Sequence, residues 1–181
     1  KGDITNMIRS YIHRCQKDGV KIVMNCEVTP ELIKEEKPDS VIIATGSKTL
    51  ILPIEGIDNP AIIHGSDLLD GKRAAGKKVL VVGGGMVGCE TAAFLGEQEH
   101  DVTVIEFRDT VGADVIHEHR VYLMKDFEDY GIKEITGAKV CKFYEDGVEY
   151  ETADGVRHES RGYDSVILSM GFRNYNPLEE K

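Results

Sequence analysis

The feature that most constrains the fold of this chain is a glycine loop, Gly83-Gly84-Gly85-Met86-Val87-Gly88, which satisfies the pattern G-x-G-x-x-G. The pattern alone is weak evidence, but its surroundings are the ones it needs. We predict a strand at residues 78–82 before the loop, a helix from Met86 to about Gln98 after it, and a second strand at residues 102–105. This order is typical of the βαβ unit that begins a dinucleotide-binding fold.

The glycines of this loop have separate structural roles. Gly83 permits a tight turn, Gly85 lets the backbone approach a pyrophosphate, and Gly88 lets the helix lie close to the strand. Unpaired amides and the helix dipole attract the diphosphate, and each such interaction contributes about 0.3–1 kcal/mol. We therefore expect residues 83–88 to bind a nucleotide diphosphate, with a glycine turn that holds no ligand as the alternative.

An acid at the end of the next strand favours one dinucleotide. Glu106 follows the loop by about 20 residues, and a carboxylate there can accept both adenosine ribose hydroxyls but would repel a 2′-phosphate. This favours NAD(H). Arg108 could serve a 2′-phosphate instead, or form a surface ion pair, and Phe107 between them belongs to the predicted cofactor site. Glu90 either complements the helix dipole or lies towards the nicotinamide end.

Composition excludes several other classes of protein. The 181 residues include 22 Lys and Arg against 32 Asp and Glu, so the net charge of −10 argues against nucleic acid as a partner. The apolar runs are far shorter than the roughly 18 residues of a membrane span, and no secretory signal is visible. Four widely spaced cysteines without C-x-x-C fit reduced thiols. We expect a cytoplasmic protein with no membrane partner.

The sequence offers no second chemistry. His117 and His119 would point to different sides of a helix, and no nearby ligand completes a zinc-like spacing. No nucleophile motif is visible, and Cys89 in the helix after the loop is typical of a small packing residue. We predict no metal site and no catalytic side chain.

The remaining predicted elements alternate between helices and strands. Before residue 48 we expect helices at about 4–15 and 30–37 and strands at 21–24 and 41–44, the second of them in a parallel sheet covered on both faces. Residues 48–77, rich in Gly and Pro, are predicted to be a connection. Later we expect a helix at about 114–129, a strand from Lys133, hairpins turning at Asp146-Gly147 and Asp154-Gly155, and a last strand at 166–168.

An internal repeat adds to this organisation. Residues 18–28 align without gaps on 130–140, with Gly19 matching Gly131, and residues 39–42 match 164–167. Coincidence between two helix–strand units is the alternative. If the repeat is real, the first copy lacks the glycine-loop half that precedes the second. The chain would then begin inside a second nucleotide-binding domain and be a fragment.

These motifs together resemble a known family along the whole chain. They are Thr45-Gly46, the stretch with Pro53, Gly56 and Asp58, the Gly83–Glu90 loop, Val104-Ile105-Glu106, and Gly171-Phe172-Arg173 with Asn176-Pro177-Leu178. They resemble the pyridine nucleotide-dependent flavoprotein oxidoreductases. The greatest similarity is to the C-terminal part of the group that contains 2,4-dienoyl-CoA reductase, NADH oxidase and trimethylamine dehydrogenase.

The resemblance implies an α/β fold: a Rossmann-like three-layer FAD/NAD(P)-binding fold with a parallel sheet, crossover helices and a β-meander. It implies a partial FAD-type domain and connection at residues 1–60, an NAD(H)-binding domain at 61–175, and a return to the FAD domain at 176–181. Thr45 and Gly46 would contact the flavin side, whereas Gly83–Gly88, Glu90, Glu106 and Gly171 would line the NAD(H) side.

The implied activity is transfer of hydride from NADH to FAD, and then of electrons to FMN and a [4Fe-4S] cluster elsewhere in the intact protein. The upstream FAD fingerprint, the cluster cysteines and a C-terminal Gly-Asp motif are absent, so we expect NAD(H) binding but no turnover by this chain alone. Glu99 stands where such helices often place Gly, which would cost about 1 kcal/mol if it is left-handed.

Two alternatives remain open. A disulfide reductase of the lipoamide dehydrogenase type would share all of these motifs, with its redox cysteine pair upstream. A non-catalytic module that holds an adenine nucleotide would also share them. Whether the chain forms a homo-oligomer is open as well.

Overall fold

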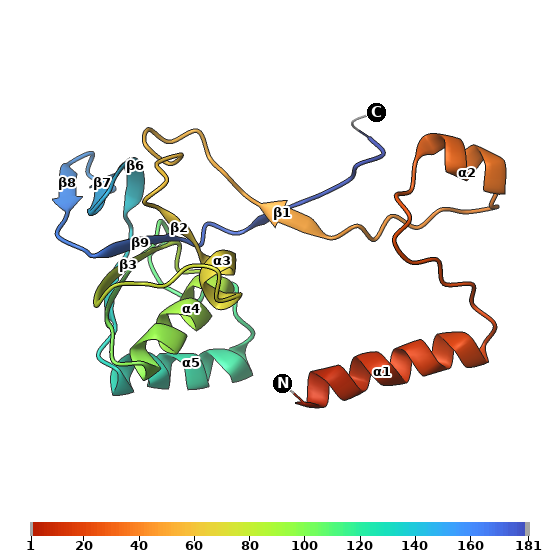
Figure 1. Ribbon diagram of the computed structural model, residues 1–181. Coiled ribbons are helices and arrows are strands. Elements are labelled where there is room, and N and C mark those ends of the chain that lie inside the picture. The colour runs from red at the N-terminus through yellow and green to blue at the C-terminus, as the bar shows by residue number, and fades with distance from the viewer. Residues whose placement is uncertain (1, 180–181) are drawn as a thin grey trace. The chain divides into compact units, whose positions relative to one another are not determined.

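Five parallel strands form a central sheet in the larger of two units, Gly46–Tyr175, of the computed structural model (Figure 1). The smaller unit comprises Lys1–Thr45 and Asn176–Lys181, and the structure describes residues 2–179. In spatial order the strands of the central sheet are β2 (Ile63–His64), β9 (Ser165–Leu168), β3 (Lys78–Val82), β4 (Asp101–Ile105) and β5 (Lys133–Ile135).

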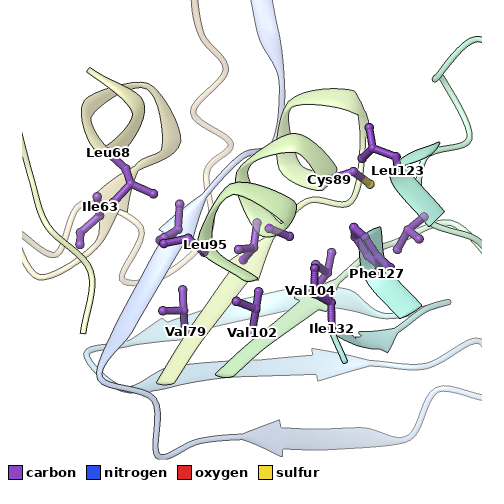
Figure 2. Close-up of a cluster of buried hydrophobic side chains, with 14 residues drawn as sticks. Ile63, Leu68, Val79, Cys89, Leu95, Val102, Val104, Leu123, Phe127 and Ile132 are labelled. Carbon is purple, nitrogen blue, oxygen red and sulfur yellow. The ribbon is translucent and has the colours of Figure 1, made fainter. Parts of the chain in front are cut away.

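The central strands are apolar along their whole length because both faces of the sheet are covered. Successive side chains of a strand point to opposite faces, so Val79 and Val81 of β3 belong to one buried cluster while Leu80 and Val82 belong to the other. The cluster beneath the helices also contains Cys89, Leu95 and Phe127, as Figure 2 shows. The parallel sheet of the predicted Rossmann-like fold is confirmed, but in this unit rather than at residues 41–44, for which covering on both faces was predicted.

Helices cover one face of the sheet. They are α3 (Gly65–Leu69), α4 (Met86–Glu97) and α5 (His117–Asp129). The predicted helix after the glycine loop is confirmed, whereas the later helix begins at His117 rather than near residue 114, because the preceding segment folds back onto the glycine loop. Gly96 permits the approach of α4 to the end of α5, since a Cβ there would lie 2.8 Å from the Cβ of Tyr130. Glu99 has φ of +64°, so the predicted left-handed residue after α4 is confirmed.

A three-stranded antiparallel meander supplies apolar side chains to the cluster on the other face of the sheet, among them Val140, Phe143 and Val148. Its strands are β6 (Lys139–Tyr144), β7 (Gly147–Glu151) and β8 (Arg157–Ser160). Both predicted hairpins form, but the first turns at residues 145–146 and places Gly147 within β7, because Tyr144 pairs with Gly147. Helices, sheet and meander make the predicted three-layer α/β fold.

The predicted connection at residues 48–77 includes regular secondary structure. This segment contains β2 and α3, and β1 (Ser47–Thr49) runs into its start. β1 pairs with β10 (Phe172–Asn174), so β9 is not the last strand as expected. These strands of two or three residues are too short to show a hydrophobic period, and they form because a partner strand lies beside them.

The smaller unit contains two helices, α1 (Gly2–Lys17) and α2 (Pro30–Glu36), both close to their predicted bounds. The Thr29 hydroxyl accepts a hydrogen bond from the Leu32 amide at 3.3 Å and caps α2, as the sequence predicts. The strands predicted at residues 21–24 and 41–44 do not form within residues 2–179. Their side chains are exposed, Ile42 by 90%, because a strand is stable only beside another strand, and the described part of this unit offers none.

The helices of the two predicted repeat copies end in the same way. The Val20 amide donates to the Cys15 carbonyl at 2.9 Å, and at the equivalent positions the Ile132 amide donates to the Phe127 carbonyl at 2.9 Å. The glycine before each amide, Gly19 or Gly131, has positive φ. Among the described helices, none is long and apolar enough to cross a membrane.

Candidate functional site

The glycine loop lies at the carboxyl end of β3, where the chain turns from the sheet into α4. Gly83 has φ of +103°, and a Cβ on it would lie 2.4 Å from the Ser169 carbonyl oxygen. A Cβ on Gly88 would lie 1.8 Å from the Gly83 carbonyl oxygen, so the first turn of α4 packs directly on the loop. The predicted roles of Gly83 in the turn and of Gly88 in close packing are therefore confirmed.

Glu106 is fixed at the carboxyl end of β4 by backbone amides. Its Oε2 accepts a hydrogen bond from the Gly84 amide at 2.6 Å, and its Oε1 accepts one from the Arg108 amide at 2.9 Å. Each carboxylate oxygen can accept a further hydrogen bond. The side chain is half-buried, so the two amides hold the carboxylate in one place beside the loop.

A second segment, the 109–116 loop, packs against the glycine loop. The Gly112 amide donates to the Gly84 carbonyl at 2.7 Å, and Val111 is fully buried. The carboxylate of Asp114 reaches the start of α4, where its Oδ1 accepts a hydrogen bond from the Met86 amide at 3.1 Å. Asp114 therefore caps α4, a role for which its own sequence position gives no signal.

These segments enclose an open cavity of about 450 Å³. Most of the predicted cofactor residues line it: Gly83, Gly85, Met86, Val87, Glu106, Phe107, Arg108 and Gly171. The sequence prediction missed further lining residues: Asp114, Ala138, Val140, Ser169, Met170 and Phe172. Ser169, Met170 and Phe172 could have been expected, because ligands of open α/β sheets bind beyond the carboxyl ends of the strands and β9 ends at Leu168.

The other predicted site residues lie outside the lining of this cavity. The Gly84 amide is bonded to Glu106, and Gly88 packs under the loop. The Glu90 carboxylate lies 3.2 Å from Nε2 of His119 on α5, so its side chain joins two helices. Thr45 and Gly46 lie where the two units meet along the chain.

Cys89 belongs to the core rather than to the cavity. It is fully buried on α4, and its thiol donates to the Gly84 carbonyl at 3.2 Å. Burial raises the pKa of this thiol to about 12, so the thiolate does not form near neutral pH. The predicted packing role of Cys89 is confirmed.

Residues 3–181 match the pyridine nucleotide-disulphide oxidoreductase family of proteins. The chain belongs to this family. The chain is 31% identical to the bilirubin reductase of Mediterraneibacter gnavus over 185 residues, covering 100% of this chain and 28% of that protein. It is 33% identical over 157 residues to the NADH oxidase of Thermoanaerobacter brockii, covering 84% of this chain and 24% of that protein.

A solved structure of 2-naphthoyl-CoA reductase with 2-naphthoyl-CoA has the same fold as this member of the family. The two structures superpose with a TM-score of 0.82 and are 32% identical in sequence. The match covers 98% of this chain and 27% of the 2-naphthoyl-CoA reductase chain. The chain therefore spans between 24% and 28% of the length of these relatives. The resemblance expected from the motifs, and the Rossmann-like FAD/NAD-binding fold, are confirmed.

The residues of this oxidoreductase-family chain fit a dinucleotide. Gly83 and Gly88 make a loop that tolerates no Cβ, the helix after it begins at the cavity, and a fixed carboxylate stands beside it. The wall beside Gly85 is acidic, because a Cβ there would lie 3.1 Å from Oδ2 of Asp114. The cavity thus combines amide donors at one helix end with two carboxylates, Glu106 and Asp114.

Proposed function

We propose that this chain is the NAD(H)-binding part of a flavin-dependent oxidoreductase. The observation that carries the proposal is the Glu106 carboxylate, which two amides fix beside the glycine loop at the edge of the cavity. This is the position at which a dinucleotide-binding fold receives the adenosine ribose. Membership of the family supports the same assignment.

The roles of the cavity residues follow from this placement. The loop from Gly83 to Gly88 and the start of α4 would hold the diphosphate, because the helix dipole favours negative charge there. Glu106 would accept the ribose hydroxyls. Phe107, which is 68% exposed and lines the cavity, offers a flat face for the adenine ring.

The opposite end of the cavity would receive the nicotinamide. Gly171 has φ of +97° and carries the chain past the end of β9 with only backbone facing the cavity there. When bound, NADH supplies a hydride that the FAD of the intact protein accepts, while this chain binds and orients the cofactor. No side chain of the chain is assigned an acid, base or nucleophile role.

NAD(H) is favoured over NADP(H) by the same carboxylate. A 2′-phosphate would lie beside the negative charge of Glu106 and be repelled. Arg108 lines the cavity as well, but the bond that it makes to Glu106 comes from its backbone amide, and its guanidinium is not needed to fix the site. We therefore propose that NADH binds more tightly than NADPH.

Two parts of the proposal concern the longer protein. Residues 1–60 and 176–181 would belong to an FAD-type domain, in which Thr45 and Gly46 contact the flavin side, and residues 61–175 would form the NAD(H) domain. FMN and a [4Fe-4S] cluster would receive the electrons elsewhere in the intact protein.

Calorimetric titration of the chain with NADH, NADPH and ADP tests the assignment. We expect NADH to bind more tightly than NADPH, and Glu106→Gln to weaken NADH binding by about tenfold, because a hydrogen bond to a charged acceptor contributes about 1.5–3 kcal/mol. Glu118→Gln is the matched control, since Glu118 is an exposed acid of α5 outside the cavity lining. Binding of none of the three nucleotides would overturn the proposal, and tighter binding of NADPH would transfer the ribose role to Arg108.

Two other functions make different predictions for the full-length protein. A disulfide reductase would reduce a disulfide substrate with NADH and would carry a redox cysteine pair outside this chain. A non-catalytic module would bind ADP as tightly as NADH and transfer no hydride. Stopped-flow measurement of flavin reduction by NADH in the full-length protein separates hydride transfer from simple nucleotide binding.

A further inference from the structure

We infer that the Asp114 carboxylate occupies the place of the nucleotide diphosphate when no nucleotide is bound. The inference rests on the proposed function, because it assumes that the diphosphate binds at the start of α4. It goes further because it proposes that Asp114, an acid of the 109–116 loop, controls the affinity for the nucleotide. Binding would require this carboxylate to leave the helix end.

The first argument is position. Oδ1 of Asp114 accepts a hydrogen bond from the Met86 amide at 3.1 Å. Oδ2 lies 3.1 Å and Oδ1 3.4 Å from the point that a Cβ on Gly85 would occupy. Gly85 is the glycine whose missing side chain lets a pyrophosphate approach the backbone. The carboxylate therefore fills the space that this glycine leaves open.

The second argument is charge. A carboxylate at the start of a helix receives the same attraction from the amides and the dipole that a phosphate would receive. Glu106 already lies beside the loop, where it accepts a hydrogen bond from the Gly84 amide. A diphosphate entering this site would meet two carboxylates, and its repulsion from Asp114 would be strongest because both need the same amide.

The third argument is that the carboxylate can move while its loop stays. The backbone of the 109–116 loop is anchored: Gly112 donates to Gly84, Arg120 Nη2 donates to the Val111 carbonyl at 3.1 Å, and Val111 is buried. Asp114 itself is exposed, and within residues 2–179 no cationic side chain forms an ion pair with it. A change of side-chain rotamer would free the Met86 amide without unfolding the loop.

The test compares two single-charge variants of the 181-residue chain. Asp114→Asn keeps an oxygen acceptor for the Met86 amide but removes the charge. Asp109→Asn removes the same charge from an exposed acid of the same loop that does not line the cavity. Thermal melting of each variant verifies the fold, and calorimetry then measures the affinity for ADP and for adenosine.

We expect Asp114→Asn to tighten ADP binding roughly three- to tenfold, as follows from the interaction of one charge with a helix end. Adenosine, which has no phosphate, should bind equally to the wild-type chain and to this variant. Asp109→Asn should change ADP affinity less than about twofold. In ¹⁵N NMR spectra of the wild-type chain, ADP should shift the Met86 amide resonance, because that amide would exchange Asp114 for phosphate.

The outcomes separate the inference from the proposed function. ADP affinity that is unchanged or weaker in Asp114→Asn would overturn the inference while leaving the nucleotide site intact. Equal tightening of adenosine would overturn it too, because the effect would then lie away from the diphosphate. Failure of ADP to bind to the wild-type chain and to both variants would overturn the nucleotide site and the inference together.

Discussion

The two segments predicted to be repeat copies have the same helix ends but differ in the residues that follow. After α1 and after α5, a left-handed glycine is followed by an amide that donates back to the last turn of the helix at 2.9 Å. The segments that follow then differ. Residues 166–168 of β9 are 0–1% exposed, whereas the equivalent Val41, Ile42 and Ile43 are exposed by 49%, 90% and 47% and form no strand in the described part of the chain.

The difference shows that helix ends depend only on nearby residues, whereas strands depend on distant ones. A helix end satisfies its own carbonyls with amides a few residues away, so the same short sequence gives the same structure in both copies. A strand must exchange hydrogen bonds with a neighbour. β9 has β2 and β3 beside it, and the equivalent residues of the smaller unit have no such neighbours within residues 2–179.

The largest expected difference between the two regions is in thiol reactivity. Raising the pKa of Cys89 from 9.0 to about 12 lowers its thiolate fraction near neutral pH about a thousandfold. We expect iodoacetamide to label the exposed Cys26 of the smaller unit at least that much faster than Cys89. Peptide mapping after timed labelling checks this, with Cys26→Ser as the control. Equal labelling rates would show that the core around α4 opens freely.

The raised pKa also has a consequence for stability against pH. Below about pH 9 the Cys89 thiol is neutral in both folded and unfolded chains. Between pH 9 and about pH 12 only the unfolded chain releases this proton, so stability falls as pH rises through that window. Cys89→Ala should flatten this part of the profile in urea unfolding measured at several pH values.

A matched pair of substitutions tests the comparison of strands directly. Ile167→Ala removes a fully buried side chain from the central sheet and should lower the free energy of unfolding by about 2–5 kcal/mol. Ile42→Ala, at the equivalent repeat position, should change it by less than about 0.5 kcal/mol. Hydrogen exchange of the β3 amides in urea reports on the larger unit alone. A similar loss for both variants would mean that residues 41–43 are packed in solution.

The smallest expected effect concerns left-handed residues that are not glycine. Glu99 after α4 and Lys37 after α2 have φ of +64° and +47°. Glu99→Gly should stabilise the larger unit by up to about 1 kcal/mol, because glycine has no Cβ penalty there. Lys37→Gly should leave the exchange of β3 amides unchanged. A destabilised Glu99→Gly variant would show that contacts of the Glu99 side chain stabilise the unit by more than the left-handed backbone conformation costs.

The sequence predicted the elements whose cause is local. The G-x-G-x-x-G loop, α4, β4 and the helix caps follow from glycine conformations and hydrophobic period, and so do the roles of Gly83 and Gly88. It failed for β1, β2 and β10, whose two or three residues show no period and depend on distant partners. It also predicted strands at residues 21–24 and 41–44, which form no strand in the described chain, because an apolar run does not reveal whether a partner strand lies beside it.

The site was predicted where it depends on the loop and missed where other segments fold against it. Glu106 was found because its distance along the chain from Gly83 is set by one helix and one strand. Asp114 was missed because its place depends on Gly112 and Arg120 holding the 109–116 loop against Gly84. The pairing of Glu90 with His119 likewise depends on how α4 and α5 pack, which no spacing reveals.

The position of β9 between β2 and β3 determines when the larger unit can fold during synthesis. A ribosome releases β3, α4, β4 and β5 first, because the strand that joins β2 to them follows all of them in the sequence. Until Ser165–Leu168 emerges, the inner edge of β3 carries unpaired backbone groups beside an uncovered apolar surface. The nascent chain therefore passes through a stage in which the edge of β3 is open. Addition of the four-residue strand β9 pairs that edge and, in the same step, brings residues 169–172 to the wall of the cavity.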